Sequence, residues 1–384
     1  MSSLFPTYKR KHIELQKGSG TIVFDQNNKR YLDFTSGIAV TSLGHCHPEV
    51  VKALKEQSER IWHTSNLFEI QQQELLAETL VNQTNLDAAF FCNSGAEANE
   101  AAIKLAKKFT KRNKIITFKN SFHGRTFGSM SATGQQKIKE GYGPLLSEFI
   151  HLPWNDRQQL KNTVDSDTAA IMMEVIQGEG GVKVADPSFY KEVQEMCKQH
   201  DILLIIDEVQ TGIGRTGKRY AYEHFDLDPD IVTLAKGLGN GFPIGAMLGK
   251  SKLKEAFGPG SHGTTFGGNP LACAVSQTVL NIIFSDNFLS EVKRKGIDFI
   301  NRLVDSLMKL PFVNEIRGEG LLIGIECDQA AELIKALEEN GLLTVPAGEK
   351  VIRLLPPLTV TDEELETALR IINEAFNNIY TKAI

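Results

Sequence analysis

The chain has 384 residues, which is too long for one hydrophobic core and predicts a large domain and a smaller one. A net charge of -5 argues against a nucleic acid or an anionic membrane as partner, and no run approaches the roughly 18 consecutive apolar residues that span a bilayer. The five cysteines are scattered and form no CxxC pair, which predicts reduced thiols in a cytoplasmic protein rather than disulfides or a zinc site.

Residues 1–49 are expected to form an N-terminal segment with a β-hairpin, because the β-rich runs Thr21–Phe24 and Arg30–Phe34 flank the turn residues Asp-Gln-Asn-Asn. Between residues 50 and 270, predicted helices alternate with short apolar runs that show little polar alternation. Such runs are typical of strands buried on both faces, so this region predicts a large α/β domain with a mostly parallel sheet. The expected strands are Ala88–Phe91, Ile115–Phe118, Phe149–Leu152, Ala169–Val175, Ile202–Ile206, Ile231–Ala235 and Ala246–Gly249, and the expected helices include Glu49–Arg60, Gln71–Gln83, Ala96–Phe109 and Ser188–His200.

Residues 271–384 are expected to form a linking helix and a smaller α+β domain. Strands are predicted over 313–327, 342–345 and 351–355. A final helix is expected to start near Thr361, where Thr-Asp-Glu-Glu supplies an N-cap and an acidic first turn. The N-terminal hairpin is expected to pack near this smaller domain.

Polar residues follow the ends of three predicted strands, where open α/β sheets place their ligands. Ser94, Gly95 and Ala96 begin a helix, and a helix N-terminus offers unpaired N–H groups to a phosphate. Ser94 and Glu97 also have the spacing of a capping box, which explains the serine without any ligand. The sequence leaves both interpretations of this stretch open.

Asp207 ends an apolar strand, where its charge is costly to bury unless another group answers it. It could cap the following segment, bind a metal together with Glu208, or face a protonated ring nitrogen. Lys236 also ends an apolar strand, so it is either a solvated lysine at a loop edge or a desolvated nucleophile toward an aldehyde. The glycines that follow it lack the dinucleotide and P-loop patterns. A phosphate cradle, a carboxylate and an amine together supply what pyridoxal phosphate needs.

The motifs IIDEVQTGIGRTG and PDIVTLAKGLGNGFPIGA resemble the signature of the class-III, fold-type-I aminotransferases, which depend on pyridoxal 5'-phosphate. The resemblance extends from GIAVTSLGHCHP to VIRLLPPL, which is nearly the whole chain. Within the family, FFCNSGAEANEAAIKLA, SFHGRTFGSMSATG, IQGEGGV and HGTTFGGNPLA are similar to the members that act on N2-acetyl-L-ornithine in arginine biosynthesis. The fold that the resemblance implies has a mostly parallel seven-stranded sheet in the large domain.

The resemblance implies a role for each motif residue. Lys236 would hold the cofactor as a Schiff base and move the substrate proton, and Asp207 would pair with the ring nitrogen. Gln210 would lie near the ring oxygen, with Phe122 and Val209 on the two ring faces. Thr265 would reach the phosphate of the neighbouring subunit's cofactor, which makes a homodimer part of the mechanism. The residues expected to bind the cofactor are therefore Ser94, Gly95, Ala96, Phe122, Asp207, Glu208, Val209, Gln210, Lys236 and Thr265.

The implied reaction moves the δ-amino group of N2-acetyl-L-ornithine to 2-oxoglutarate and gives N-acetyl-L-glutamate 5-semialdehyde and L-glutamate. Both substrates carry carboxylates, which suit bidentate arginine. Arg125 would bind the carboxylate of the amine and the distal carboxylate of 2-oxoglutarate, and Arg353 would bind the α-carboxylate. Glu179 would cover Arg353 when an amine enters, and Thr264 would lie near the substrate.

Ile38 stands where ornithine aminotransferases typically carry a tyrosine for the free α-amino group, which favours an acetylated substrate. Ornithine, succinylornithine and 4-aminobutyrate stay open as alternative donors. An aminomutase and a non-catalytic binding protein of the same fold are further alternatives, and net consumption of 2-oxoglutarate separates transfer from mutase activity. His45-Cys46-His47 lacks a third ligand at a suitable spacing, so no metal is expected, and His123 has no assigned role.

Overall fold

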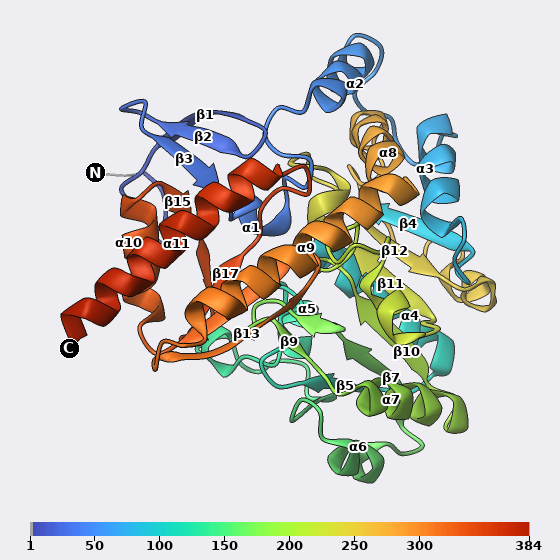
Figure 1. Cartoon of the computed structure of the whole chain (residues 1–384). Helices are drawn as coiled ribbons and strands as arrows, with labels where there is room; N and C mark the ends of the chain where they lie inside the picture. The colour runs from blue at the N-terminus through green and yellow to red at the C-terminus, as the bar shows by residue number, and fades with distance from the viewer. Residues whose placement is uncertain (1–2, 384) are drawn as a thin grey trace.

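A seven-stranded sheet forms the centre of the computed structural model, which describes residues 3–383 (Figure 1). Its strand order is β4-β12-β11-β10-β7-β5-β6. Only β12 runs antiparallel to its neighbours, so the prediction of a mostly parallel sheet is confirmed. The strands are β4 (Ala88–Cys92), β5 (Lys114–Phe118), β6 (Phe149–Leu152), β7 (Thr168–Met173), β10 (Leu203–Asp207), β11 (Ile231–Leu234) and β12 (Gly245–Gly249).

Helices cover both faces of this sheet, which explains why its strands are continuous apolar runs. In β10, Leu203 and Ile205 pack in the core cluster that contains the apolar face of α4 (Gly95–Thr110). Leu204 and Ile206 point to the opposite face and pack in the cluster that contains the apolar residues of α7 (Pro187–Gln199). Because successive strand residues alternate between faces, a sheet with two covered faces needs apolar residues at both.

Three further helices extend the large sheet unit. Helix α8 (Pro270–Ile283) packs against α2 (Pro48–Ser58) and α3 (Gln71–Val81).

The long helical stretch expected beyond Leu271 is divided into α8 and α9 (Asp286–Leu307). The division lies at Ser285, whose backbone is extended (φ -75°, ψ 138°) and so cannot continue a helix. Shorter helices α5 (Phe127–Ala132) and α6 (Arg157–Thr163) complete this part of the chain.

The C-terminal part contains a separate antiparallel sheet of order β13-β14-β17-β16. The single predicted strand region 313–327 is a hairpin of two strands, and helix α10 within this part was not predicted. Thr361 caps the last helix as expected, because its Oγ1 accepts a hydrogen bond from the N–H of Glu364 (3.1 Å). The elements are β13 (Val313–Glu319), β14 (Leu322–Cys327), α10 (Ala330–Glu339), β16 (Val345–Ala347), β17 (Val351–Leu354) and α11 (Asp362–Ala383).

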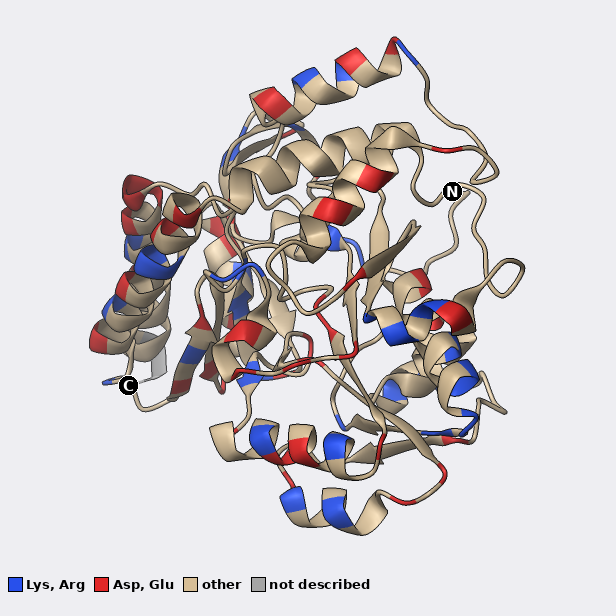
Figure 2. Cartoon of the chain, turned by 90° about the vertical axis from the view of Figure 1, so that its right-hand side faces the viewer, with Lys and Arg blue, Asp and Glu red and all other residues tan. Residues whose placement is uncertain are grey.

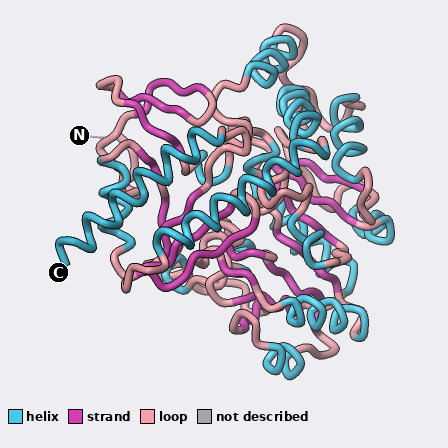
Figure 3. Tube along the Cα trace, in the orientation of Figure 1, coloured by secondary structure: helices cyan, strands magenta, loops and turns pink. Residues whose placement is uncertain are grey.

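The first strands of the chain share a sheet with a C-terminal segment (Figure 3). This sheet contains β1 (Leu15–Ser19), β2 (Ile22–Asp25) and β3 (Arg30–Asp33), and β3 pairs in parallel with β15 (Leu342–Leu343). The expected hairpin is therefore β2 and β3. Strand β1 was not predicted, because LQKGS is mostly exposed and lacks an apolar face. A short helix, α1 (Ser36–Ala39), follows β3 and leads toward the large sheet.

Charged residues are mixed over the outer helices. In the view of Figure 2, basic and acidic positions alternate along these helices instead of forming separate areas of one sign. No helix within residues 3–383 is long and apolar enough to cross a membrane.

Candidate active site

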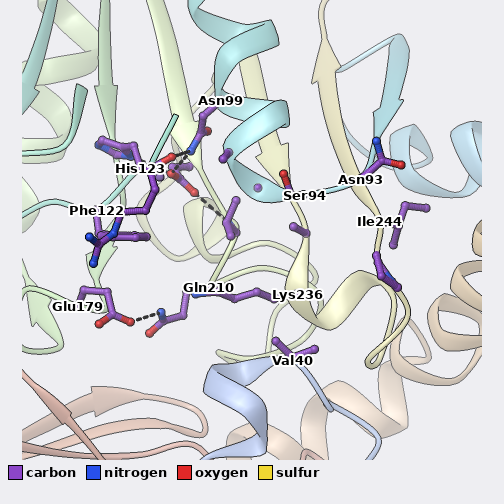
Figure 4. Close-up of a pocket in the computed structure, with 18 of the residues that line it drawn as sticks. Val40, Asn93, Ser94, Asn99, Phe122, His123, Glu179, Gln210, Lys236 and Ile244 are labelled. Atoms are coloured by element: carbon purple, nitrogen blue, oxygen red, sulfur yellow. Dashed lines mark hydrogen bonds and ion pairs between the residues drawn. The ribbon is translucent and has the colours of Figure 1, made fainter. Parts of the chain in front are cut away.

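Four neighbouring strands deliver the polar side chains of one cavity. Strands β5, β7, β10 and β11 are parallel, so their carboxyl ends meet at one edge of the sheet. Asp207 ends β10, and the segments after β5, β7 and β11 carry His123, Glu174 and Lys236 respectively. All four line a cavity of about 390 Å³ (Figure 4). This is where the strand-end rule for open α/β sheets places a ligand site.

The start of α4 lies at the wall of this cavity. Ser94 Oγ accepts a hydrogen bond from Glu97 N (3.2 Å), as in a capping box. The Glu97 carboxylate, however, accepts a hydrogen bond from Asn93 N (2.8 Å) and not from the N–H of Ser94. The N–H groups of Gly95 and Ala96 have no partner within the helix and remain available to an anion. Helix capping by Ser94 and phosphate binding by the start of α4 are thus compatible.

Gly95 has a packing reason to be glycine. A Cβ at this position would lie 2.7 Å from Cγ1 of Val209, which no real Cβ contact tolerates. Because Gly95 has no side chain, the first turn of α4 packs closely against Val209. Val209 and the phosphate-binding candidates of α4 therefore line the same cavity.

The carboxylate of Asp207 accepts hydrogen bonds from residues of the same chain. Asp207 is buried, and its Oδ2 accepts hydrogen bonds from Asn99 Nδ2 (2.8 Å) and His123 Nδ1 (2.7 Å). Its Oδ1 accepts one from Val209 N (3.0 Å). Figure 4 shows His123 and Asn99 on the same side of the cavity. These bonds hold the carboxylate in one orientation at the cavity wall.

Glu208 points away from the cavity. Its carboxylate accepts hydrogen bonds from Thr211 Oγ1 (2.5 Å) and Tyr222 N (2.8 Å), and burial raises the pKa of Glu208 to about 7. Glu208 does not line the cavity although its neighbour Asp207 does, and its place among the cofactor-binding residues stays a prediction. Asp207 and Glu208 do not form a metal site, and residues 3–383 contain no group of three or more histidines, cysteines or carboxylates that could hold one.

Lys236 begins the short 3-10 turn Lys236–Leu238 after β11. Its backbone has a positive φ of 43°, a conformation that non-glycine residues adopt mainly where the surroundings require it. Burial lowers the pKa of its amine, and the nearby Arg353 acts in the same direction, although Glu179 and Asp207 oppose the shift. A lowered pKa increases the fraction of neutral amine, which is the nucleophilic form.

A partly buried ion pair, between Arg353 and Glu179, lies near Lys236. Arg353 in β17 is fully buried. Its Nη1 donates to Glu179 Oε1 (2.7 Å) and to Gln210 Oε1 (2.7 Å). Burial alone would raise the pKa of Glu179, but Arg353 holds it below the ordinary value. The amide of Gln210 bridges this pair, because its Nε2 also donates to Glu179 (3.3 Å).

Arg125 differs from Arg353 in its exposure and in its ion-pair partners. It is exposed at the cavity mouth, and it makes no ion pair within residues 3–383. Its guanidinium lies 5.9 Å from the ring centroid of Phe122, which also lines the cavity. The site thus has one arginine covered by a carboxylate and one open to a ligand.

Five predicted residues do not line this cavity: Glu208 and Arg353, described above, and Thr264, Thr265 and Ile38. Thr264 Oγ1 accepts hydrogen bonds from Asn93 Nδ2 (3.2 Å) and Gly267 N (3.1 Å), and Thr265 is exposed. Ile38 is 40% exposed, and Val40 lines the cavity instead. The rim residues would need another chain, or a bound substrate, to complete their expected contacts.

The sequence did not indicate Asn99 or Glu174 as site residues, and it assigned no role to His123. Glu174 directly follows the buried strand β7, as Asp207 ends β10, so the same strand-end argument would have found it. His123 and Asn99 lie in a loop and a helix, and nothing in their local sequence indicates that both contact Asp207.

The residues that face the cavity fit pyridoxal phosphate. Unpaired N–H groups at the start of α4 suit a phosphate, and a buried carboxylate suits a protonated ring nitrogen. The Lys236 amine lines the same cavity and has no hydrogen-bond or ion-pair partner within residues 3–383, which leaves it available to an aldehyde. The donor set therefore suits the cofactor.

Comparison with known proteins gives one family. Residues 5–376 match the family model of class-III aminotransferases. The acetylornithine aminotransferase of Bacillus subtilis (strain 168) is 56% identical over 98% of both chains. The structure of N-acetylornithine aminotransferase from Stenotrophomonas maltophilia superposes with a TM-score of 0.86 at 38% identity, over 98% of both chains. An ornithine aminotransferase structure from Toxoplasma gondii, described with partial occupancy of PLP at the active site, has a TM-score of 0.93 at 34% identity and covers 98% of this chain and 93% of its own.

Proposed function

This chain belongs to the class-III aminotransferases, and from that premise we propose that it transfers the δ-amino group of N2-acetyl-L-ornithine to 2-oxoglutarate. The products would be N-acetyl-L-glutamate 5-semialdehyde and L-glutamate, a step of arginine biosynthesis. The observation that carries the proposal is one cavity lined by Lys236, whose pKa is lowered, by the buried Asp207 and by the exposed Arg125, with Arg353 bound to the cavity residue Glu179. The relatives at more than half identity that bear the acetylornithine name support the choice of donor.

Pyridoxal phosphate is the proposed cofactor, and when bound it supplies an aldehyde and an electron-withdrawing ring. Gly95 and Ala96, with Ser94, would bind its phosphate. Asp207 would accept a hydrogen bond from its ring nitrogen. Phe122 and Val209 would cover the two ring faces, and Gln210 would lie near the ring oxygen.

Lys236 has two tasks in the proposed reaction. Its Nζ would hold the cofactor between turnovers, and during turnover it would move a proton at the substrate carbon that carries the amine. Both tasks need an amine that can be neutral, which the burial of Lys236 favours. The positive φ at Lys236 fixes where the side chain leaves the backbone.

The two arginines divide the recognition of the two substrates. Arg125, exposed and without a carboxylate partner among the described residues, would bind the carboxylate that the amine donor and 2-oxoglutarate have in common. Arg353 would bind the α-carboxylate of 2-oxoglutarate after Glu179 swings away. While Glu179 covers Arg353, Arg125 is the only arginine lining the cavity within residues 3–383, which suits a donor whose amine end must reach Lys236.

The donor is the part of the proposal that needs the sharpest test. Ile38 offers no partner to a free α-amino group, which favours the acetylated donor, whereas structural relatives include ornithine aminotransferases. We would measure kcat/KM with 2-oxoglutarate and acetylornithine, ornithine, succinylornithine or 4-aminobutyrate. Acetylornithine should have the highest value. Equal or higher turnover of ornithine would replace the proposed donor, and turnover without consumption of 2-oxoglutarate would indicate a mutase.

A homodimer in the cytoplasm is the proposed assembly. The segments 62–68 and 263–267 lie side by side, because Asn66 Nδ2 donates to the carbonyls of Thr264 (3.3 Å) and Gly267 (3.2 Å). They expose large apolar side chains, with Leu67 89% and Phe266 62% accessible. A second copy would cover this surface and bring Thr265 of the partner subunit to the phosphate.

A further inference from the structure

The four residues of α1 (Ser36–Ala39) all have a left-handed backbone. Their φ angles lie between 46° and 68°, and the residues on either side, Thr35 and Val40, have negative φ. Residues with a Cβ enter this region mainly one at a time, because the Cβ crowds the following carbonyl oxygen. A positive φ is rarer still for a β-branched residue such as Ile38. The turn is therefore strained, and it persists only because its surroundings hold it.

Asp33, the last residue of β3, holds the start of this turn. Its Oδ1 accepts hydrogen bonds from Thr35 N (2.9 Å), Thr35 Oγ1 (2.6 Å) and Ser36 N (3.1 Å). Its Oδ2 lies 2.8 Å from Nε2 of His45, which belongs to the segment after the turn. Asp33 is buried, so these partners take the place of water around the carboxylate. One carboxylate thus fixes the chain on both sides of the turn.

The turn is also attached to the end of β17. Ser36 is fully buried, and its Oγ donates a hydrogen bond to the carbonyl of Leu355 (2.6 Å), the residue that directly follows this strand. Two backbone bonds flank this contact, from Leu355 N to Phe34 O (2.8 Å) and from Leu358 N to Ser42 O (2.7 Å). Residues 34–42 are therefore held against the C-terminal sheet.

The position of the turn matters at the cavity, because Val40 is the residue that follows it. Val40 lines the cavity of Lys236, whereas Ile38 does not. Among the described residues, Val40 is the one lining residue that precedes Asn93 in the chain. Figure 4 shows Val40 on the N-terminal segment, at the edge of this cavity. A change in the turn would therefore move an apolar part of the wall without altering a polar group of the cavity.

We propose that Val40 contacts the carbon chain of the ω-amine donor and contributes to substrate specificity, and that Asp33 is the positioning residue that sets Val40 through the left-handed turn. The donor offers one carboxylate to Arg125, so the methylenes between this carboxylate and the amine need apolar surface. Val40 supplies such surface in the cavity that Arg125 also lines. The inference rests on the proposed role of Arg125, but it does not depend on which ω-amine is the natural donor.

A series of unbranched monocarboxylates tests the contact without any amine donor. Propanoate, butanoate and pentanoate would be measured as inhibitors of the reaction of glutamate with the cofactor-loaded enzyme, followed by the cofactor absorbance. In the wild type, each added methylene should lower the inhibition constant about three- to fourfold, the effect of burying one methylene. In Val40→Ala this gain should fall below about twofold per methylene, because part of the apolar wall is missing. An unchanged gain in Val40→Ala would overturn the proposal.

Two further variants identify the cause of a lost gain. Val51→Ala is the matched control, because Val51 in α2 is also partly buried but does not line the cavity, and its series should equal that of the wild type. The same loss in Val51→Ala would overturn the contact at Val40. Arg125→Ala should weaken all three acids by the same factor, since they share the carboxylate. Unchanged inhibition in Arg125→Ala would overturn the proposed carboxylate receptor together with this inference, whereas the result for Val40→Ala overturns the inference alone.

A double-mutant cycle tests whether Asp33 acts through Val40. Asp33→Ala should reduce the gain per methylene as Val40→Ala does, but it should add almost nothing in a Val40→Ala background. Asp33→Asn keeps an oxygen for Thr35 and Ser36 and should restore the wild-type series. Additive losses in the double variant would overturn the positioning role. If Asp33→Ala does not fold, Ser36→Ala takes its place in the cycle, because it removes only the hydroxyl that bonds Leu355.

Discussion

The floor and the rim of the cavity are built in opposite ways. At the floor, Asp207 is buried and its oxygens accept bonds from Asn99, His123 and Val209 of the same chain. At the rim, segments 62–68 and 263–267 leave large apolar side chains open to solvent. The difference teaches that the contacts of Asp207 are complete within one chain, whereas the rim has an exposed apolar surface that the proposed partner subunit would cover. The predictions below test that division, from the largest expected effect to the smallest.

Lys236→Ala should abolish aminotransferase activity and the covalent attachment of the cofactor. We expect kcat to fall by about 10⁴-fold or more, because both the nucleophilic amine and the proton carrier are lost. Borohydride reduction of the cofactor-loaded wild type should leave an adduct at Lys236 by mass spectrometry, and the variant should show none. Lys252→Ala is the control, since this lysine pairs with Asp230 outside the cavity and should behave as wild type. An adduct at another residue would move the cofactor site elsewhere.

Arg125→Ala and Arg353→Ala should separate the two half-reactions. Arg125→Ala should cost about 2 to 5 kcal/mol in the transition state with both substrates, the range for removing one partner of a desolvated charge pair. Arg353→Ala should weaken the reaction with 2-oxoglutarate more than the reaction with the amine, because Glu179 covers Arg353 in the present arrangement. Single-turnover kinetics of each half-reaction measure both effects. An equal loss in both half-reactions for Arg353→Ala would contradict the switching role of Glu179.

The sequence predicted the floor better than the rim, for a physical reason. Asp207 ends an apolar strand and Lys236 closely follows one. A charge at the end of a buried strand is conspicuous in a sequence, because the burial of an unpaired charge is costly. The seven strands of the large sheet were found because two covered faces require continuous apolar runs. Glu174 follows the same rule but was not recognised.

Contacts between distant segments were beyond the reach of local patterns. His123 and Asp207 are 84 positions apart, and their hydrogen bond exists only because β5 and β10 lie in one sheet. The boundary between α8 and α9 at Ser285 and the division of 342–345 between two sheets also depend on tertiary contacts. Ile38 has a positive φ of 68° and is partly exposed, which its apolar character does not suggest.

Glu208→Gln should change the pH dependence of stability. Burial raises the pKa of Glu208 from 4.5 to about 7, so the folded state keeps a proton that the unfolded chain releases near pH 4.5. The stability that this proton contributes is complete below pH 4.5 and is lost as the pH rises through about 7. The variant should therefore gain on wild type at higher pH by at most about 3 kcal/mol. Chemical denaturation at about pH 5 and pH 8 measures the change, and an equal difference at both pH values would contradict it.

The smallest effect tests the rim. Thr265 is exposed in its own chain, and we expect Thr265→Ala to weaken cofactor binding by about 1.5 kcal/mol, the lower figure for a hydrogen bond to a charged group. A hybrid dimer of one Lys236→Ala chain and one Thr265→Ala chain reveals whose phosphate the threonine reaches. If it serves the partner subunit, both defects fall in one site, and the remaining site binds the cofactor with wild-type affinity. If it serves its own chain, the site that keeps Lys236 carries the weakened phosphate contact. Cofactor titration of the hybrid against both parent dimers decides between these arrangements, and a monomer in light scattering would remove the premise of both.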